Sequence, residues 1–334
     1  MWLFIVGTPI VGKAEESGND VLKGFSYTII APENQQNKNL GYYDLKMEKN
    51  QQQTVQLQLN NTSTKVMTVE IRLNSAKTNN NGVIEYGLNH LEKDPSLKYD
   101  FAEIVKGPKK ETIPANTSKV IDLNIAMPST PVEGYIAGGI QLEPTFRDVE
   151  NTNQKNKVIE NRFAFLIGML LSETEMKSIK PEVKLNKVYP GLADNERNLF
   201  VSLSNSRSVF LENMSVDVSI RKNGKEASLF DVHKEDMRMA PNSLMNFPVP
   251  LENKRLVKGD YIAQIHITAD SGMKWSWSEE FTISESDVAL LNAQIIQEPK
   301  KTPQIIVQLF ILAGISILIL VFGILVKRKK NKLS

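Results

Sequence analysis

Two short motifs have the spacing of a nucleophilic active site. Ser219-Ile220-Arg221-Lys222 and Ser271-Gly272-Met273-Lys274 match the S-x-x-K motif of penicillin-binding enzymes. That chemistry needs the serine at the start of a helix, with the lysine one turn later on the same face. Both motifs fall in segments with strand or turn character, where residues three apart face opposite ways, and no K-T-G motif accompanies them. We therefore expect no hydrolase or transferase activity and no enzyme.

Metal and cofactor chemistry has equally little support. The three histidines, His90, His233 and His266, are far apart in sequence and show no metal-ligand spacing. The chain has no cysteine, which excludes disulfides, thiolate metal sites and cysteine nucleophiles. It also lacks the G-x-S-x-G, H-E-x-x-H and glycine-rich phosphate-binding motifs. The sequence predicts neither a metal ion nor an organic cofactor.

Aromatic pairs are the best candidates for contacting a partner. Trp275 and Trp277 lie on one face of an expected strand, where two indoles form a flat platform for sugar or protein. The alternative, and the commoner arrangement, is that both rings pack into the core of a sandwich. Tyr42 and Tyr43 point to opposite sides of an extended chain, so at least one ring should face solvent. These four residues are the candidate partner-binding residues.

The elements that would position these side chains are strands. Apolar and polar residues alternate with a period of two in four segments, namely residues 55–60, 67–74, 214–220 and 261–267. One of them ends at Asn223-Gly224, a dipeptide that accepts the positive φ angles of a tight hairpin. No long helical periodicity competes with them before residue 305. The expected class is all-β, with two immunoglobulin-like β-sandwich modules followed by one C-terminal transmembrane helix.

A weak internal repeat supports two modules. The blocks at residues 59–61, 114–116 and 132–137 recur in the same order at 203–205, 240–242 and 257–263. We expect a first module over residues 18–157 and a second over 158–283. The alternative is that residues 163–171 form the last strand of the first sandwich, in a hairpin with residues 138–142. A stalk should follow over residues 284–304, with a short helix near residues 288–296.

The C-terminal segment predicts a membrane anchor. Residues 305–326 carry no charge and, as a helix rising about 1.5 Å per residue, would span roughly 33 Å, enough to cross a bilayer. The tail that follows, residues 327–334, is basic. By the positive-inside rule it lies in the cytoplasm and the bulk of the chain lies outside, in a single-pass topology. The residues that set this topology are Lys327, Arg328, Lys329, Lys330 and Lys332.

Export requires a signal, and residues 1–14 have part of one. Residues 2–11 are apolar and Gly12-Lys13-Ala14 is a small-x-small cleavage pattern, but the usual basic n-region is missing.

The net charge of the rest of the chain bears on its partners. Without the five basic tail residues, the chain has 35 basic and 38 acidic residues. This near-neutral body lacks the basic surface of a nucleic-acid-binding protein, so nucleic acid is excluded as a partner.

Several sequence blocks, taken in order, resemble the WxL-interacting proteins of Gram-positive bacteria. The resemblance covers nearly the whole expected exported region, and no single block is diagnostic alone. The blocks lie at residues 24–36, 41–45, 74–79, 138–142, 161–165, 186–191 and 239–243.

The resemblance implies a first module of the peptidoglycan-binding type and a second of the host-binding type. It also implies WxL-domain surface proteins as partners. We therefore expect a membrane-anchored cell-surface scaffold that links wall peptidoglycan, a WxL-domain protein and host extracellular components. The alternatives are a surface-assembly chaperone that uses an open sheet edge and, with less support, an anchored cell-wall enzyme.

Overall fold

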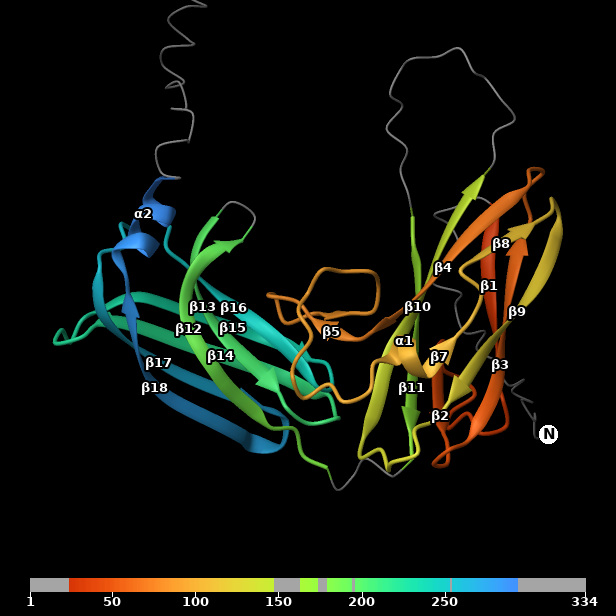
Figure 1. Cartoon of the computed structure of the whole chain (residues 1–334), viewed down its shortest axis with the longest axis horizontal. Helices are drawn as coiled ribbons and strands as arrows, with labels where there is room; N and C mark the ends of the chain where they lie inside the picture. Colours follow the sequence, from red (N-terminus) through yellow and green to blue (C-terminus); the bar gives the residue numbers. More distant parts are fainter. Residues whose placement is uncertain (1–23, 147–162, 174–178, 194–195, 253, 294–334) are drawn as a thin grey trace, which may run out of the picture.

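The computed structural model describes residues 24–146, 163–173, 179–193, 196–252 and 254–293. Within these residues the chain is almost entirely β, and the strands form two sandwiches side by side (Figure 1). The prediction of an all-β chain built from sandwich modules is confirmed.

The first sandwich packs a four-stranded sheet, in the order β1-β3-β9-β7, on a five-stranded sheet in the order β2-β11-β10-β4-β8. A short helix, α1 (Phe101–Ile104), precedes β7, and a small hairpin of β5 and β6 projects from the second sheet. The strands are β1 (Phe25–Ile30), β2 (Tyr43–Lys46), β3 (Gln52–Asn61), β4 (Met67–Ser75), β5 (Lys77–Thr78), β6 (Ile84–Glu85), β7 (Val105–Lys106), β8 (Lys110–Ile113), β9 (Thr117–Ala126), β10 (Tyr135–Phe146) and β11 (Phe165–Ser172).

The alternating pattern of the sequence explains this packing. From Val55 in β3 and from Ile121 in β9, every second side chain is buried against the facing sheet, while the residues between them are more exposed. The chain also crosses from one sheet to the other near its start, since β1 pairs with β3 but β2 pairs in parallel with β11. Strands β1 and β2, which follow one another in the chain, therefore each form an edge of a different sheet.

The second sandwich packs a three-stranded sheet, β12-β13-β16, on a four-stranded sheet, β15-β14-β17-β18. Its core is separate from that of the first sandwich and is built around Tyr261, Phe247 and the apolar residues of β14 and β17. The elements are β12 (Val183–Ala193), β13 (Glu196–Asn205), β14 (Leu211–Lys222), β15 (Ser228–Met239), β16 (Ser243–Pro250), β17 (Gly259–Ala269), the 3-10 turn η2 (Asp270–Gly272), β18 (Met273–Ile283) and α2 (Glu285–Ala293).

The internal repeat seen in the sequence has a physical cause. Asn61 and Asn205 end equivalent strands, and each donates side-chain hydrogen bonds to backbone carbonyls that close the adjoining loops. Asn116 and Asn242 both adopt positive φ angles, of 53° and 48°, in the turns that lead into β9 and β16. Two of the three repeated blocks therefore contain residues that fix loop geometry in each sandwich.

Strand β11 lies in the first sandwich. It pairs antiparallel with β10 from Tyr135↔Ser172 to Leu142↔Phe165, and in parallel with β2. This is the pairing that the hairpin alternative for residues 163–171 requires. Residues 158–162, where the second module was expected to begin, lie outside the described residues.

The two ends of the chain lie mostly outside the described residues. The expected signal (1–14), transmembrane helix (305–326) and basic tail (327–334) fall wholly there. In the part of the chain that is described, no helix is both long and apolar enough to cross a membrane. The expected stalk begins with α2, which starts three residues earlier than the helix predicted at 288–296.

Candidate binding surfaces

The tryptophan pair lies on the edge strand β18. Trp275 and Trp277 share one side of the strand, opposite Ile267 and Ile265 of β17, and both indoles pack against the second core. Both remain half-buried, because β18 is the last strand of its sheet. The structure therefore places these rings at the rim of the second core. This position resembles the core-packing alternative more than an exposed platform.

The two tyrosines do face opposite sides of the chain. Tyr43 is fully buried, and its hydroxyl donates a 2.7 Å hydrogen bond to the Gln56 carbonyl, so in this fold it is a core residue with no surface to offer a partner. Burial also raises the pKa of Tyr43. Tyr42 is half-buried on the outer face of the five-stranded sheet, beside Gly168 of β11. Of this pair, only Tyr42 is accessible.

Tyr42 belongs to an aromatic cluster at the junction of the modules. We define the junction cluster as Tyr42, Tyr86, Tyr135, Phe210 and Arg238. The rings of Tyr135 and Phe210 are 5.7 Å apart, and the Arg238 guanidinium lies 6.0 Å from the Phe210 ring. Burial raises the pKa of all three tyrosines, and the Tyr42 phenol contributes to the rise for the other two. Sequence reasoning found only Tyr42, since these residues come from five separate segments with no local signal.

Polar contacts also join the modules. Thr78 of β5 meets Ser243 at 2.6 Å between hydroxyl oxygens and accepts a 2.9 Å bond from the Ala240 amide, and both side chains are buried. The Asp94 carboxylate accepts a hydrogen bond from the buried Ser204 hydroxyl. Such buried contacts are costly to leave unmade. The segment between β4 and α1 therefore connects the two sandwiches (Figure 1).

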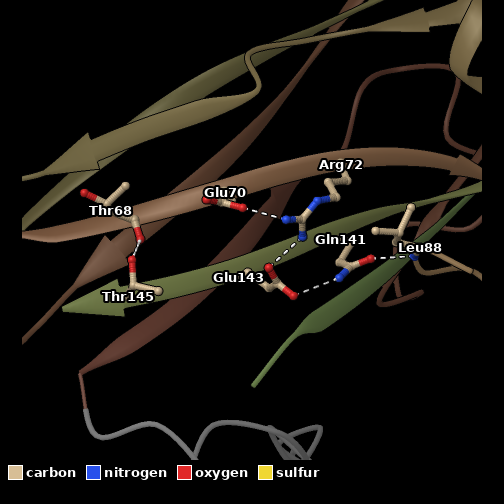
Figure 2. Close-up of polar contacts among 7 residues, drawn as sticks. All are labelled: Thr68, Glu70, Arg72, Leu88, Gln141, Glu143 and Thr145. Carbon is tan, nitrogen blue, oxygen red and sulfur yellow. Dashed lines mark hydrogen bonds and ion pairs between the residues drawn. The ribbon is translucent and has the colours of Figure 1, made fainter. Parts of the chain in front are cut away.

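The outer face of the five-stranded sheet carries an ordered polar surface, which we call the polar face. It consists of Thr68, Glu70 and Arg72 of β4 and Gln141, Glu143 and Thr145 of β10 (Figure 2).

Arg72 bridges the two strands of the polar face. Its guanidinium donates to Glu70 and to Glu143, at 2.6 Å each. Gln141 accepts a 2.6 Å bond from the Leu88 amide and donates to Glu143 at 3.3 Å. The side chains of Arg72 and Glu143 remain 32% and 23% exposed, so a ligand can reach them.

The polar face suits binding more than catalysis. Both carboxylates are held by Arg72, whereas a general acid or base must be free to exchange a proton with the substrate. A hollow of about 430 Å³ adjoins Arg72 on one side, between β4 and residues 102–109. The planar guanidinium and the carboxylate groups offer hydrogen bonds to hydroxyl and amide groups of a polymer.

The structure brings two of the histidines together. His233 of β15 and His266 of β17 lie opposite Asp217 on either side of β14. The Nδ1 atom of His233 is 2.6 Å from the Asp217 carboxylate and its Nε2 atom is 2.9 Å from Glu235, while the Nδ1 atom of His266 is 2.9 Å from the Ser276 hydroxyl. Among the described residues no group of three or more ligating side chains is arranged to hold a metal ion.

A prediction concerns the protonation of His233. Hydrogen bonds to Glu235 and to Asp217 raise the pKa of His233 above its ordinary value of 6.5. Because the pKa is raised in the folded state, the contacts of protonated His233 with Glu235 and Asp217 stabilise the fold. This stabilisation is fully present below about pH 6.5 and is lost as pH rises through the pKa of the folded state. In an NMR titration, Glu235→Gln should lower this pKa and Glu226→Gln should not. An unchanged pKa in Glu235→Gln would contradict the assignment.

Two sandwiches with accessible polar and aromatic surfaces define a modular binding protein. A model of the WxL Interacting Protein peptidoglycan binding domain matches residues 25–144, and one of the WxL Interacting Protein host binding domain matches residues 154–293. The chain therefore belongs to the WxL Interacting Protein family, as its sequence blocks predicted. It is a surface protein whose modules bind peptidoglycan and host components. The second match includes β11, although the strand partners of β11 lie in the first sandwich.

Solved structures give a more distant likeness. The Pseudomonas aeruginosa CupB2 chaperone is 12% identical with a TM-score of 0.28, covering 69% of this chain and 93% of that chain. The class 5 fimbriae chaperone CfaA is 13% identical with a TM-score of 0.30, covering 78% and 99%. The E. coli chaperone DraB is 13% identical with a TM-score of 0.29, covering 78% and 98%. No curated protein matches the chain.

Proposed function

We propose that this protein is a non-catalytic scaffold, anchored in the cell membrane by residues 305–326, that holds wall peptidoglycan on its first module and a WxL-domain protein as partner. Host extracellular components are the ligands of the second module. Peptidoglycan lies on the polar face of the five-stranded sheet. The polar face carries this assignment because its hydrogen-bonding groups lie within residues 25–144, which match the peptidoglycan binding domain.

The chemistry of the polymer fits this surface. Peptidoglycan presents hydroxyl groups, amides and carboxylates, and the polar face offers an arginine and two carboxylates that are fixed by one another, with Glu143 also held by the buried Gln141 amide. Fixed groups lose little conformational entropy on binding, which favours affinity. The half-exposed apolar side chain of Leu166, on the next strand, adds a surface for the apolar faces of sugars.

Sedimentation with purified peptidoglycan tests the proposal. Replacing Arg72 by alanine removes the group that positions Glu70 and Glu143, so we expect the affinity of the full chain to fall by about tenfold, which is roughly 1.4 kcal/mol. Asp122→Ala is the matched control, because Asp122 accepts a 3.0 Å bond from Gln56 on the outer face of the other sheet. Equal losses in both variants, or no loss in either, would reject the polar face as the site.

The proposed anchor rests on the uncharged stretch at 305–326 and the basic tail after it. Protease added to intact, wall-stripped cells should digest both sandwiches and leave only the helix and tail. A protected body of about 30 kDa would reverse this topology.

A further inference from the structure

The four sheets of the two sandwiches have eight edge strands, and seven of them carry features that hinder pairing with another chain. Strands β2, β7 and β8 have at most four residues, and residues 34–36 hydrogen-bond along β2. Strands β12 and β15 have register shifts, β16 contains Pro248 and Pro250, and β18 carries Lys274, Glu279 and Glu280. The exception is β1.

Strand β1 has none of these features. Its sequence, FSYTII, has no charge, proline or glycine, and all six residues pair with β3 without a register shift. Aromatic and β-branched residues of this kind favour strand pairing. No described residue pairs with its other side.

The register shows which backbone groups are free. The amide of Thr62 donates to the carbonyl of Gly24, and the residues of antiparallel strands alternate between hydrogen-bonded and non-hydrogen-bonded pairs. The hydrogen-bonded pairs that follow are Ser26↔Asn60, Thr28↔Gln58 and Ile30↔Gln56. The N–H and C=O groups of Phe25, Tyr27 and Ile29 therefore point to the open edge.

The same side of the sandwich has an incomplete apolar rim. Phe165 of β11 lies 5.0 Å from the Phe25 ring and 6.1 Å from the Tyr27 ring, measured between centroids. Tyr27, Ile29 and Phe165 are only partly buried, although they pack on the first core. Strand β2 covers only Met169–Ser172 of β11, so among the described residues no strand lies beyond the first half of β11. An added strand would cover apolar side chains here.

We propose that a WxL-domain protein binds here by adding an extended, uncharged strand to the free edge of β1. Main-chain hydrogen bonds to Phe25, Tyr27 and Ile29 supply much of the affinity. Apolar side chains at alternate positions of the partner strand pack on Tyr27 and Phe165 and supply selectivity. The uncharged edge selects an uncharged partner strand, because a charge placed here would be desolvated without a counter-charge. This inference rests on the WxL partnership of the proposed function.

Hydrogen exchange distinguishes edge pairing from other modes of binding. In the free protein the amides of Ser26, Thr28 and Ile30 should exchange slowly and those of Phe25, Tyr27 and Ile29 rapidly. Adding a purified WxL-domain protein from the same genome should slow the second set by about a hundredfold. Rapid exchange of the second set in the complex would overturn the proposal.

Mutation separates backbone pairing from side-chain contact. Tyr27→Pro removes an outward N–H that β3 does not use, whereas Tyr27→Ala removes only the ring. We expect the proline variant to bind the WxL-domain protein about a hundredfold more weakly than the alanine variant, with both still folded. Equal affinities would overturn the proposal, as would abolition of binding by Trp277→Ala in a folded second module.

Two further results identify the cause of a failure. Concentration-dependent protection of the Tyr27 amide without any partner would show that a second copy occupies the edge, and would overturn the proposal. Failure of the wild-type chain to bind the WxL-domain protein while it still binds peptidoglycan would reject this inference and leave wall binding standing. If the wild-type chain binds neither the WxL-domain protein nor peptidoglycan, the proposed function itself is rejected.

Discussion

Replacing Asn205 by alanine should lower the free energy of unfolding of the second module by about 3 kcal/mol. The Asn205 side chain is fully buried and donates to the carbonyls of Val209, at 2.7 Å, and Ala240, at 3.0 Å. Alanine would leave the Val209 carbonyl without this partner and would create a cavity. A buried acceptor without a hydrogen bond costs about 1–3 kcal/mol, and the cavity adds to that cost.

Urea unfolding of the variants measures this effect. Asn246→Ala is the matched control, since Asn246 lies half-buried on β16 of the same module, and we expect it to cost less than about 1 kcal/mol. Asn61→Ala should destabilise the first module in the same way, because Asn61 donates to the carbonyls of Lys65, Ile113 and Pro114. Equal stability of Asn205→Ala and Asn246→Ala would show that the loop contacts contribute little.

Features set by short-range chemistry could be predicted from the sequence. The alternation of apolar and polar residues identified β3, β4, β14 and β17 as strands. Successive side chains of a strand point to opposite faces, and here one face is more buried than the other. The repeated Asn61 and Asn205 were detectable because loop closure needs the same amide at the same point of each module. The serine-lysine motifs were rejected for the same kind of reason, since Ser219 and Lys222 lie on β14.

Features that depend on packing between distant segments could not be predicted. Nothing near Tyr135 or Phe210 in the sequence indicates that their rings meet, because the docking of the two modules brings them together. Strand β11 was ambiguous because residues 163–171 are apolar in almost every position, so their pattern does not assign them to either module. The polar face was missed because Arg72 and Glu143 become neighbours only through the register of β4 and β10.

Replacing Gly82 by alanine should loosen the docking of the two modules while each stays folded. Gly82 has a φ of +71°, its carbonyl accepts a 2.8 Å bond from the Arg238 amide, and an added Cβ would lie 2.6 Å from the Met237 Cβ. Met237 is a buried core residue of the second module and cannot easily move away. The loop must therefore move away from β15, which weakens the contact between the modules by about 1–3 kcal/mol.

Distances between spin labels measure this docking directly. The chain has no cysteine, so Ser118→Cys and Ser278→Cys, which are exposed on the first and second modules, can be labelled specifically. Gly224→Ala is the matched control, because Gly224 has a φ of +75° but nothing lies within 4 Å of an added Cβ. Both alanine variants bear the strain of a positive φ, about 1 kcal/mol, and only Gly82→Ala adds a clash at the junction. We expect a narrow distance distribution in the parent and in Gly224→Ala and a broad one in Gly82→Ala, whereas identical distributions would show that the junction does not depend on this contact.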